Sequence, residues 1–137
     1  MNLKINHIQH IGIPVSNMDK SITFYERLGF KNVMPSTFEI EGEKGGIVAM
    51  MERNTMIIEL YQLPASHLPE IKNRKDGHID HIAFDVDDIV AEMVRLKNEG
   101  FIVLNETPKK GADNKLVAFL HPKSTNGVLI ELCQEIK

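Results

Sequence analysis

Apolar residues alternate with other residues near the start of the chain. Over residues 10–15 every second side chain is a branched apolar one, a period of two that predicts a half-buried strand. A helix is predicted next, because Ser16 or Asn17 can cap it and Gly29 can end it in a left-handed conformation. The apolar positions expected on its inner face are Met18, Ile22 and Tyr25.

The same pattern occurs a second time further along the chain. Residues 7–30 align with residues 78–101 without a gap, and seven of the aligned positions are identical. In the second copy Asp87 or Asp88 can cap the helix and Gly100 can end it. The inner positions expected for this helix are Ile89, Met93 and Leu96. The chain therefore contains an internal repeat.

Each copy ends on a matching strand motif, IIEL at residues 57–60 and LIEL at residues 129–132. A short strand and a hairpin are expected between helix and motif, with a first turn at Arg53 and Asn54 and a second within residues 122–127. The predicted unit is βαβββ. The expected fold class is α+β, with two tandem βαβββ modules forming a cupped, incomplete barrel of mixed sheet with helices outside.

The repeat also sets the expected domain organisation. Module one spans about residues 5–62 and module two about residues 78–135. Residues 62–77, which carry two prolines and mixed charge, form the connector between them. At 137 residues the chain is long enough for one domain, so a single domain over residues 1–137 is expected.

Strand parity selects four polar residues that face away from the helices. Successive side chains of a strand point to opposite faces, so a polar residue between two apolar ones lies on the uncovered face. The residues in such positions are His10, Glu59, His81 and Glu131. If the two half-sheets turn their uncovered faces toward one another, two imidazoles and two carboxylates meet. His7 and His78 have the opposite parity and are expected on the outer layer, hydrogen-bonded or solvated.

Each of these residues taken alone has a simpler explanation. A single histidine on a strand is more often a structural residue, and a single glutamate more often belongs to the polar face of a half-exposed strand. The recurrence of the same pair of residue types in two repeats favours a shared metal site instead. Two imidazoles and two carboxylates suit one divalent ion of Co, Ni, Mn, Zn or Fe. Four such ligands on an octahedral ion leave two positions for water or substrate oxygens.

Composition narrows the classes of function. The chain is 42% hydrophobic and 26% charged with a net charge of −3, which gives no support to nucleic-acid binding. No apolar run is long enough to cross a membrane, and the first residues lack the apolar core of a signal peptide. The single cysteine, Cys133, cannot form an internal disulfide. A cytoplasmic location is therefore expected.

The strand motifs HIGIPV, IIEL, HIAFDV and LIEL resemble those of the vicinal oxygen chelate superfamily, which includes glyoxalases, bleomycin-resistance proteins and dioxygenases. The resemblance covers nearly the whole chain. The C-terminal stretch LVAFLHPKSTNGVLIELCQ is most similar to the methylmalonyl-CoA epimerases, which carry an FLHPK segment before their last glutamate ligand. The acidic turn that glyoxalase I more often has at this place is missing.

The resemblance implies roles for individual residues. His10, Glu59, His81 and Glu131 match the family's metal ligands. Glu131 and Glu43 are the implied acid and base, where Glu43 is the nearest match to a second epimerase glutamate on the loop before the third strand.

The implied reaction is a proton transfer next to a carbonyl or thioester through a metal-held enolate, most similar to methylmalonyl-CoA epimerase. A carboxylate whose pKa is raised by dry surroundings would serve as base. The alternatives are a glyoxalase I-type isomerisation of a hemithioacetal, as in lactoylglutathione lyase, and a glyoxalase-family resistance or metal-free binding protein.

Four lysines near the C-terminal FLHPK stretch suggest how an anionic substrate could be held. Lys115 and Lys123 are the candidates for binding the substrate, an acyl-CoA or a glutathione adduct, and Lys109 and Lys110 lie close in sequence. The alternative for each lysine is a solvated loop position. No nucleic-acid or membrane partner is expected, and the resemblance implies a homodimer.

Overall fold

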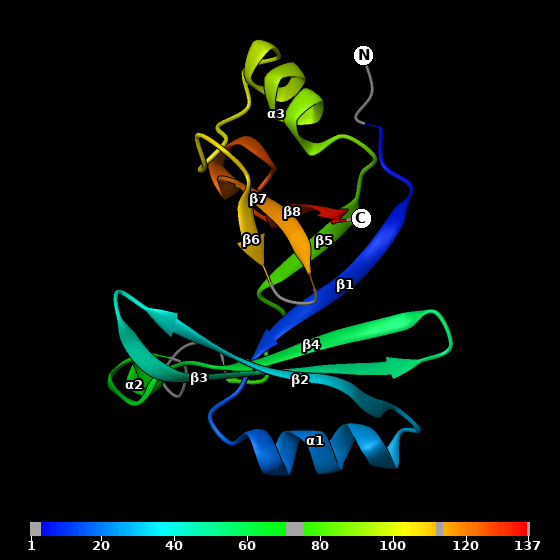
Figure 1. Ribbon diagram of the computed structural model, residues 1–137, viewed down its shortest axis with the longest axis vertical. Coiled ribbons are helices and arrows are strands. Elements are labelled where there is room, and N and C mark those ends of the chain that lie inside the picture. The colour runs from blue at the N-terminus through cyan, green and yellow to red at the C-terminus, as the bar shows by residue number, and fades with distance from the viewer. Residues whose placement is uncertain (1–3, 71–75, 112–113, 137) are drawn as a thin grey trace. The chain divides into compact units, whose positions relative to one another are not determined.

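The computed structural model describes residues 4–70, 76–111 and 114–136 (Figure 1). Within them the chain divides into two compact units, one of residues 10–80 and one in which residues 81–137 are joined by the first nine residues. Each unit has its own set of strands, its own helix against them and its own hydrophobic core. Part of the expected connector, residues 71–75, lies outside the described residues.

The unit of residues 10–80 is the first βαβββ module. Its elements are β1 (His7–Pro14, which starts in the other unit), α1 (Met18–Arg27), β2 (Lys31–Ile40), β3 (Glu43–Arg53), β4 (Met56–Gln62), a 3-10 turn η1 (Ala65–His67) and α2 (Leu68–Glu70). The strands are ordered β2-β3-β4-β1. The pair β1–β4 is parallel, whereas β2–β3 and β3–β4 are antiparallel hairpins. Figure 1 shows α1 lying along one face of this sheet.

Apolar side chains from the strands and from α1 form the core of this unit. Its buried members are Ile13, Val15, Met18, Ala49, Met51 and Leu60. Ile22 and Tyr25 of α1 pack against this cluster, as the helical spacing predicts. The helix begins at Asn17, whose side chain accepts a hydrogen bond from the backbone N–H of Lys20, and the chain leaves it through Gly29 at φ +92°.

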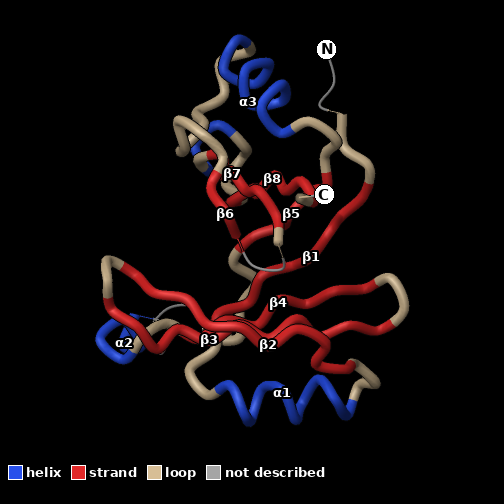
Figure 2. Tube along the Cα trace, in the orientation of Figure 1, coloured by secondary structure: helices blue, strands red, loops and turns tan. Residues whose placement is uncertain are grey.

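The second unit repeats this arrangement (Figure 2). Its elements are β5 (His81–Asp85), α3 (Ile89–Asn98), β6 (Lys109–Gly111), β7 (Lys115–Leu120), a 3-10 turn η3 (Pro122–Ser124) and β8 (Leu129–Glu135). The strands are ordered β5-β8-β7-β6, and β5–β8 is the parallel pair. Asp88 caps α3, and Gly100 follows it at φ +95°.

The core of the second unit lies between α3 and the sheet. Its buried members are Val86, Ile89, Met93, Leu96, Ala118, Leu120 and Leu132. The three positions expected on the inner face of the helix are all among them. The α+β class and the two βαβββ modules of mixed sheet are thus confirmed. Among the described residues, the helices are too short and too polar for any to reach across a bilayer.

Candidate functional site

His10 and Glu59 form a pair on the face of the first sheet that α1 leaves uncovered. In the parallel register of β1 and β4, Gly12 lies opposite Glu59, and His10 precedes Gly12 by two residues on the same face. The imidazole Nε2 lies 3.7 Å from Oε2 of Glu59. The histidine side chain is 3% exposed and the glutamate side chain 14%.

His81 and Glu131 form the equivalent pair in the second unit. Here Ala83 lies opposite Glu131 in the parallel register of β5 and β8, and His81 again comes two residues earlier. The imidazole Nε2 lies 3.4 Å from Oε1 of Glu131, with both side chains almost fully buried. The two repeats therefore place the same pair of groups at the same register. The parity prediction is correct within each unit, and His7 and His78 are exposed as expected.

A second residue lies opposite each glutamate on the antiparallel side. Met50 of β3 is in register with Glu59, and Phe119 of β7 is in register with Glu131. The ring of Phe119 meets that of His81 edge to face, with centroids 5.8 Å apart. Each imidazole–carboxylate pair thus has an apolar side chain beside it on the same sheet face.

Glu43 reaches this same sheet face because of a β-bulge. Phe38 of β2 is in register with Gly46, but two residues further along β2 Ile40 is in register with Glu43, so β3 contains one extra residue there. Gly45 lies inside the bulge at φ +108°, a conformation that residues other than glycine rarely adopt. Since a bulge reverses the alternation, Glu43 lies on the face of Met50 and Glu59, whereas regular alternation would place it under α1.

The Glu43 carboxylate is held by the segment that follows β4. The backbone N–H of Ser66 donates to its Oε2 at 3.2 Å, and the Ser66 hydroxyl donates to its Oε1. His67 Nε2 lies 4.0 Å from Oε1, and the Glu43 side chain is 38% exposed. These Ser66 hydrogen bonds, with His67 adding a smaller effect, hold the pKa of Glu43 below its usual range. The expectation of dry surroundings that raise the pKa is therefore wrong for Glu43.

Tyr61 is a residue on the same face that the sequence did not single out. It lies two residues after Glu59 on β4, in register with Val48 of β3. Burial raises the pKa of the Tyr61 hydroxyl, and the Asp80 carboxylate, to which that hydroxyl donates a hydrogen bond, raises it further. The phenol therefore keeps its proton. Strand parity after Glu59 could have identified it.

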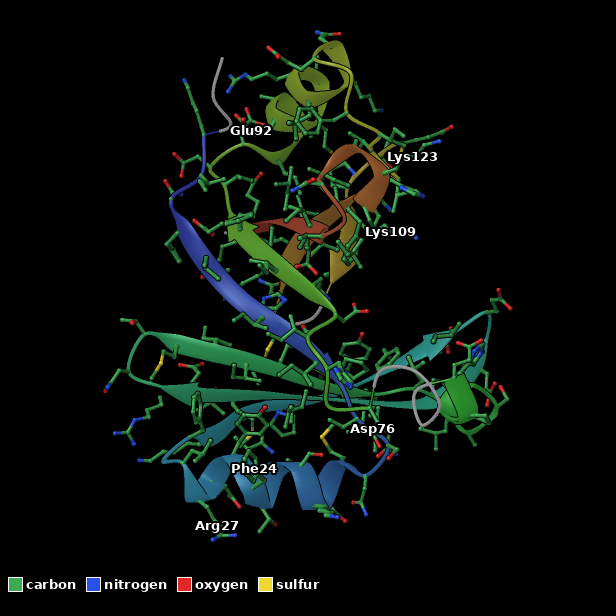
Figure 3. All side chains as sticks on the ribbon, turned by 180° about the vertical axis from the view of Figure 1, so that it is seen from behind. Phe24, Arg27, Asp76, Glu92, Lys109 and Lys123 are labelled. Atoms are coloured by element: carbon green, nitrogen blue, oxygen red, sulfur yellow. The ribbon has the colours of Figure 1, made fainter. Side chains whose placement is uncertain are left out.

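The four lysines near the FLHPK stretch do not share one environment. Lys115 at the start of β7 is only 8% exposed. It lies on the same sheet face as Phe119, four residues further along the strand. Lys109, Lys110 and Lys123 are exposed, and Figure 3 shows Lys109 on β6 and Lys123 in the turn after β7. The lysines thus divide into one buried cation and a solvated group.

Known proteins with a similar sequence span nearly all of this chain. Residues 5–132 match the family model of the Glyoxalase/Bleomycin resistance protein/Dioxygenase superfamily. The mitochondrial methylmalonyl-CoA epimerase of Dictyostelium discoideum is 34% identical over 130 residues, which cover 93% of this chain and 78% of that protein. The ethylmalonyl-CoA/methylmalonyl-CoA epimerase of Cereibacter sphaeroides is 34% identical over 135 residues, or 95% of this chain and 98% of that protein.

The fold is shared with solved structures of such epimerases. A variant of Streptomyces coelicolor methylmalonyl-CoA epimerase in complex with 2-nitronate-propionyl-CoA superposes with a TM-score of 0.84 at 28% identity. That match covers 98% of this chain and 100% of the other. Because these named relatives are epimerases, the expectation of an enzyme is confirmed.

Proposed function

This chain belongs to the Glyoxalase/Bleomycin resistance protein/Dioxygenase superfamily, and on that premise we propose that it is a divalent-metal-dependent epimerase of an acyl-CoA. The substrate would be methylmalonyl-CoA or a close relative, epimerised at the carbon next to the thioester. The observation that carries the proposal is the pair of His–Glu contacts at identical register, one in each repeat. The epimerase relatives, similar over most of the chain, support the choice of reaction.

We propose that His10, Glu59, His81 and Glu131 bind one metal ion. The donor set fits, since imidazole and carboxylate ligands suit Co, Ni, Mn, Zn and Fe. With metal–ligand bonds of about 2.1 Å, neighbouring ligand atoms of one ion lie roughly 3.0–3.5 Å apart. The N–O separations of 3.4 and 3.7 Å within the two pairs are close to that range. When bound, the ion would polarise the thioester carbonyl and stabilise the negative charge that develops on its oxygen.

Glu43 and Glu131 are the residues proposed to move the proton. A thioester α-proton is a weak acid, so its removal needs both a nearby carboxylate and stabilisation of the enolate. One carboxylate takes the α-proton on one face of the carbon, and the other, in its acid form, delivers a proton to the opposite face. The resemblance to the epimerases is the basis for assigning Glu43. The bulge at Gly45 places Glu43 on the sheet face of Glu59, seven residues along β3 from Met50, which is in register with Glu59.

Two further parts of the prediction belong to this proposal. Lys115, buried on the corresponding face of the second unit, and Lys123 are proposed to interact with the anionic substrate. A homodimer and a cytoplasmic location stay predictions from the sequence.

Exchange of the substrate α-proton with deuterated water tests the proposed reaction. Enzyme loaded with Co²⁺ or Mn²⁺ should replace the α-proton of methylmalonyl-CoA by deuterium from the solvent. Glu131→Ala should lose that exchange. His7→Ala, which alters an exposed histidine of the same strand as His10, is the matched control and should retain it.

The substrate comparison decides between the related activities. Exchange only with the methylglyoxal–glutathione hemithioacetal would replace the epimerase proposal by a glyoxalase I-type reaction. No exchange with either compound would leave a resistance or binding protein.

A further inference from the structure

Ser66 makes two contacts to one carboxylate although it lies on an exposed turn. Its backbone N–H and its hydroxyl donate to different oxygens of Glu43. Ser66 belongs to the 3-10 turn Ala65–His67, which is anchored by the fully buried Pro64 just before it. Glu43 begins β3, so these two contacts join the start of one strand to the segment after the next strand.

We propose that Ser66 is a positioning residue that fixes the carboxylate of Glu43 in its ionised form for proton abstraction. The inference rests on the proposed function, in which Glu43 is one of the two proton-transferring groups. It gives a role to the turn after β4. Neither the proposed metal site nor the internal repeat accounts for this turn. Ser66 touches Glu43 and is not expected to touch the reacting carbon.

The geometry favours the anion over the acid. The backbone N–H and the hydroxyl of Ser66 both donate to Glu43. An ionised carboxylate accepts hydrogen bonds at both oxygens, whereas in a protonated carboxyl one oxygen carries the proton and is a donor. Hydrogen bonds to the charged form lower a carboxyl pKa, as found for Glu43. The imidazole of His67 at 4.0 Å acts in the same direction when protonated. Glu41 and Lys44, which share the hairpin with Glu43, are the charged groups nearest to it along the chain.

This arrangement affects both halves of a proton transfer. Before the reaction, Glu43 is ionised and held in one place, so it can take the α-proton without first losing its own. As the C–H bond breaks, its electron pair passes into the enolate and a new O–H bond forms on Glu43. Ser66 disfavours this acid form, because its backbone N–H can only donate and a neutral carboxyl accepts a hydrogen bond more weakly than a carboxylate does. Glu43 is therefore ready to release the proton again.

The pH dependence of kcat/KM tests the role of Ser66. Since kcat/KM follows the ionisation of the free enzyme, the acid limb that depends on Glu43 should move to higher pH in Ser66→Ala. Ser66→Thr keeps both the hydroxyl and the N–H and should retain the wild-type limb. Glu43→Gln identifies the limb, because the substitution should remove it. Ser66 is exposed, so the alanine variant should fold normally.

A titration without substrate separates this inference from the proposed function. The carboxyl ¹³C signal of Glu43, assigned by its loss in Glu43→Gln, should titrate at higher pH in Ser66→Ala than in wild type or Ser66→Thr. Suppose that the wild type is active, and that Ser66→Ala shows the same acid limb of kcat/KM and the same Glu43 titration. This result would overturn the role of Ser66 and leave the proposed reaction in place. A wild type that shows no α-proton exchange, with the titration shifted as expected, would overturn the proposed reaction, and Ser66 would then only position an ionised carboxylate.

Discussion

Small residues lie opposite both candidate ligand carboxylates. Gly12 is in register with Glu59, and Ala83 is in register with Glu131. Each follows a candidate histidine ligand by two residues and lies on the same sheet face as that histidine. A larger side chain at either place would occupy the space through which the carboxylate approaches the imidazole. Residue size at these positions is therefore part of the site, although neither residue carries a polar side chain.

Ala83→Val tests this dependence on size. Ala83 is fully buried and in register with Glu131, so the added methyl groups overpack this position and should cost about 1–3 kcal/mol of unfolding free energy. The variant should also bind metal less tightly than wild type at equal free-metal concentration. Ala83→Gly is the matched control, since it leaves the space open. Equal metal affinity in Ala83→Val and wild type would contradict the proposed pairing of His81 with Glu131.

At the scale of elements, the bulge in β3 decides which face carries Glu43. Gly45 adopts φ +108° with open space around the place where a Cβ would be, so an added methyl group meets no neighbour and the cost is one of backbone conformation. Gly45→Ala should cost about 1–3 kcal/mol of unfolding free energy. If the strand relieves this strain by moving the bulge, Glu43 leaves its position and kcat/KM should fall by about 100-fold.

A second glycine provides the control for Gly45→Ala. Gly100 follows α3 at φ +95° and also has open space around it. Gly100→Ala should lower the urea midpoint to a similar extent while leaving kcat/KM unchanged. If both variants lost activity to the same extent, the loss would reflect reduced stability and the bulge would have no specific role.

Local chemistry made most elements predictable from the sequence. Asn17 and Asp88 each accept a hydrogen bond from an N–H of the first helical turn, as their side chains allow in any helix. The bulge could not be deduced from alternation, because alternation assumes a regular strand and misplaces Glu43 by one face. The glycines of the EGEKGG stretch were the available signal for it. Ser66 was missed because its hydrogen bonds to Glu43 join residues that lie 23 positions apart in the chain.

At the scale of the whole molecule, the repeat explains why two half-domains carry the same pair of groups. Each unit has its own core and its own parallel strand pair, and the His–Glu contact follows from the register of that pair. A structural histidine needs no such duplication. A single pair also supplies two protein ligands, fewer than the three or four protein ligands of typical zinc sites. The proposal therefore assigns both pairs to one ion.

Metal stoichiometry tests whether the two pairs act as one site. Wild type should bind one ion per chain, and His10→Ala and His81→Ala should each lose nearly all of it at the same free-metal concentration. The double variant should lose no more than either single variant, because both histidines serve one ion. The bound ion at 100 times its Kd should add about 2.7 kcal/mol to the unfolding free energy, and both single variants should lose this gain. Two ions per chain in wild type, with one retained in each single variant, would show that each pair binds its own ion.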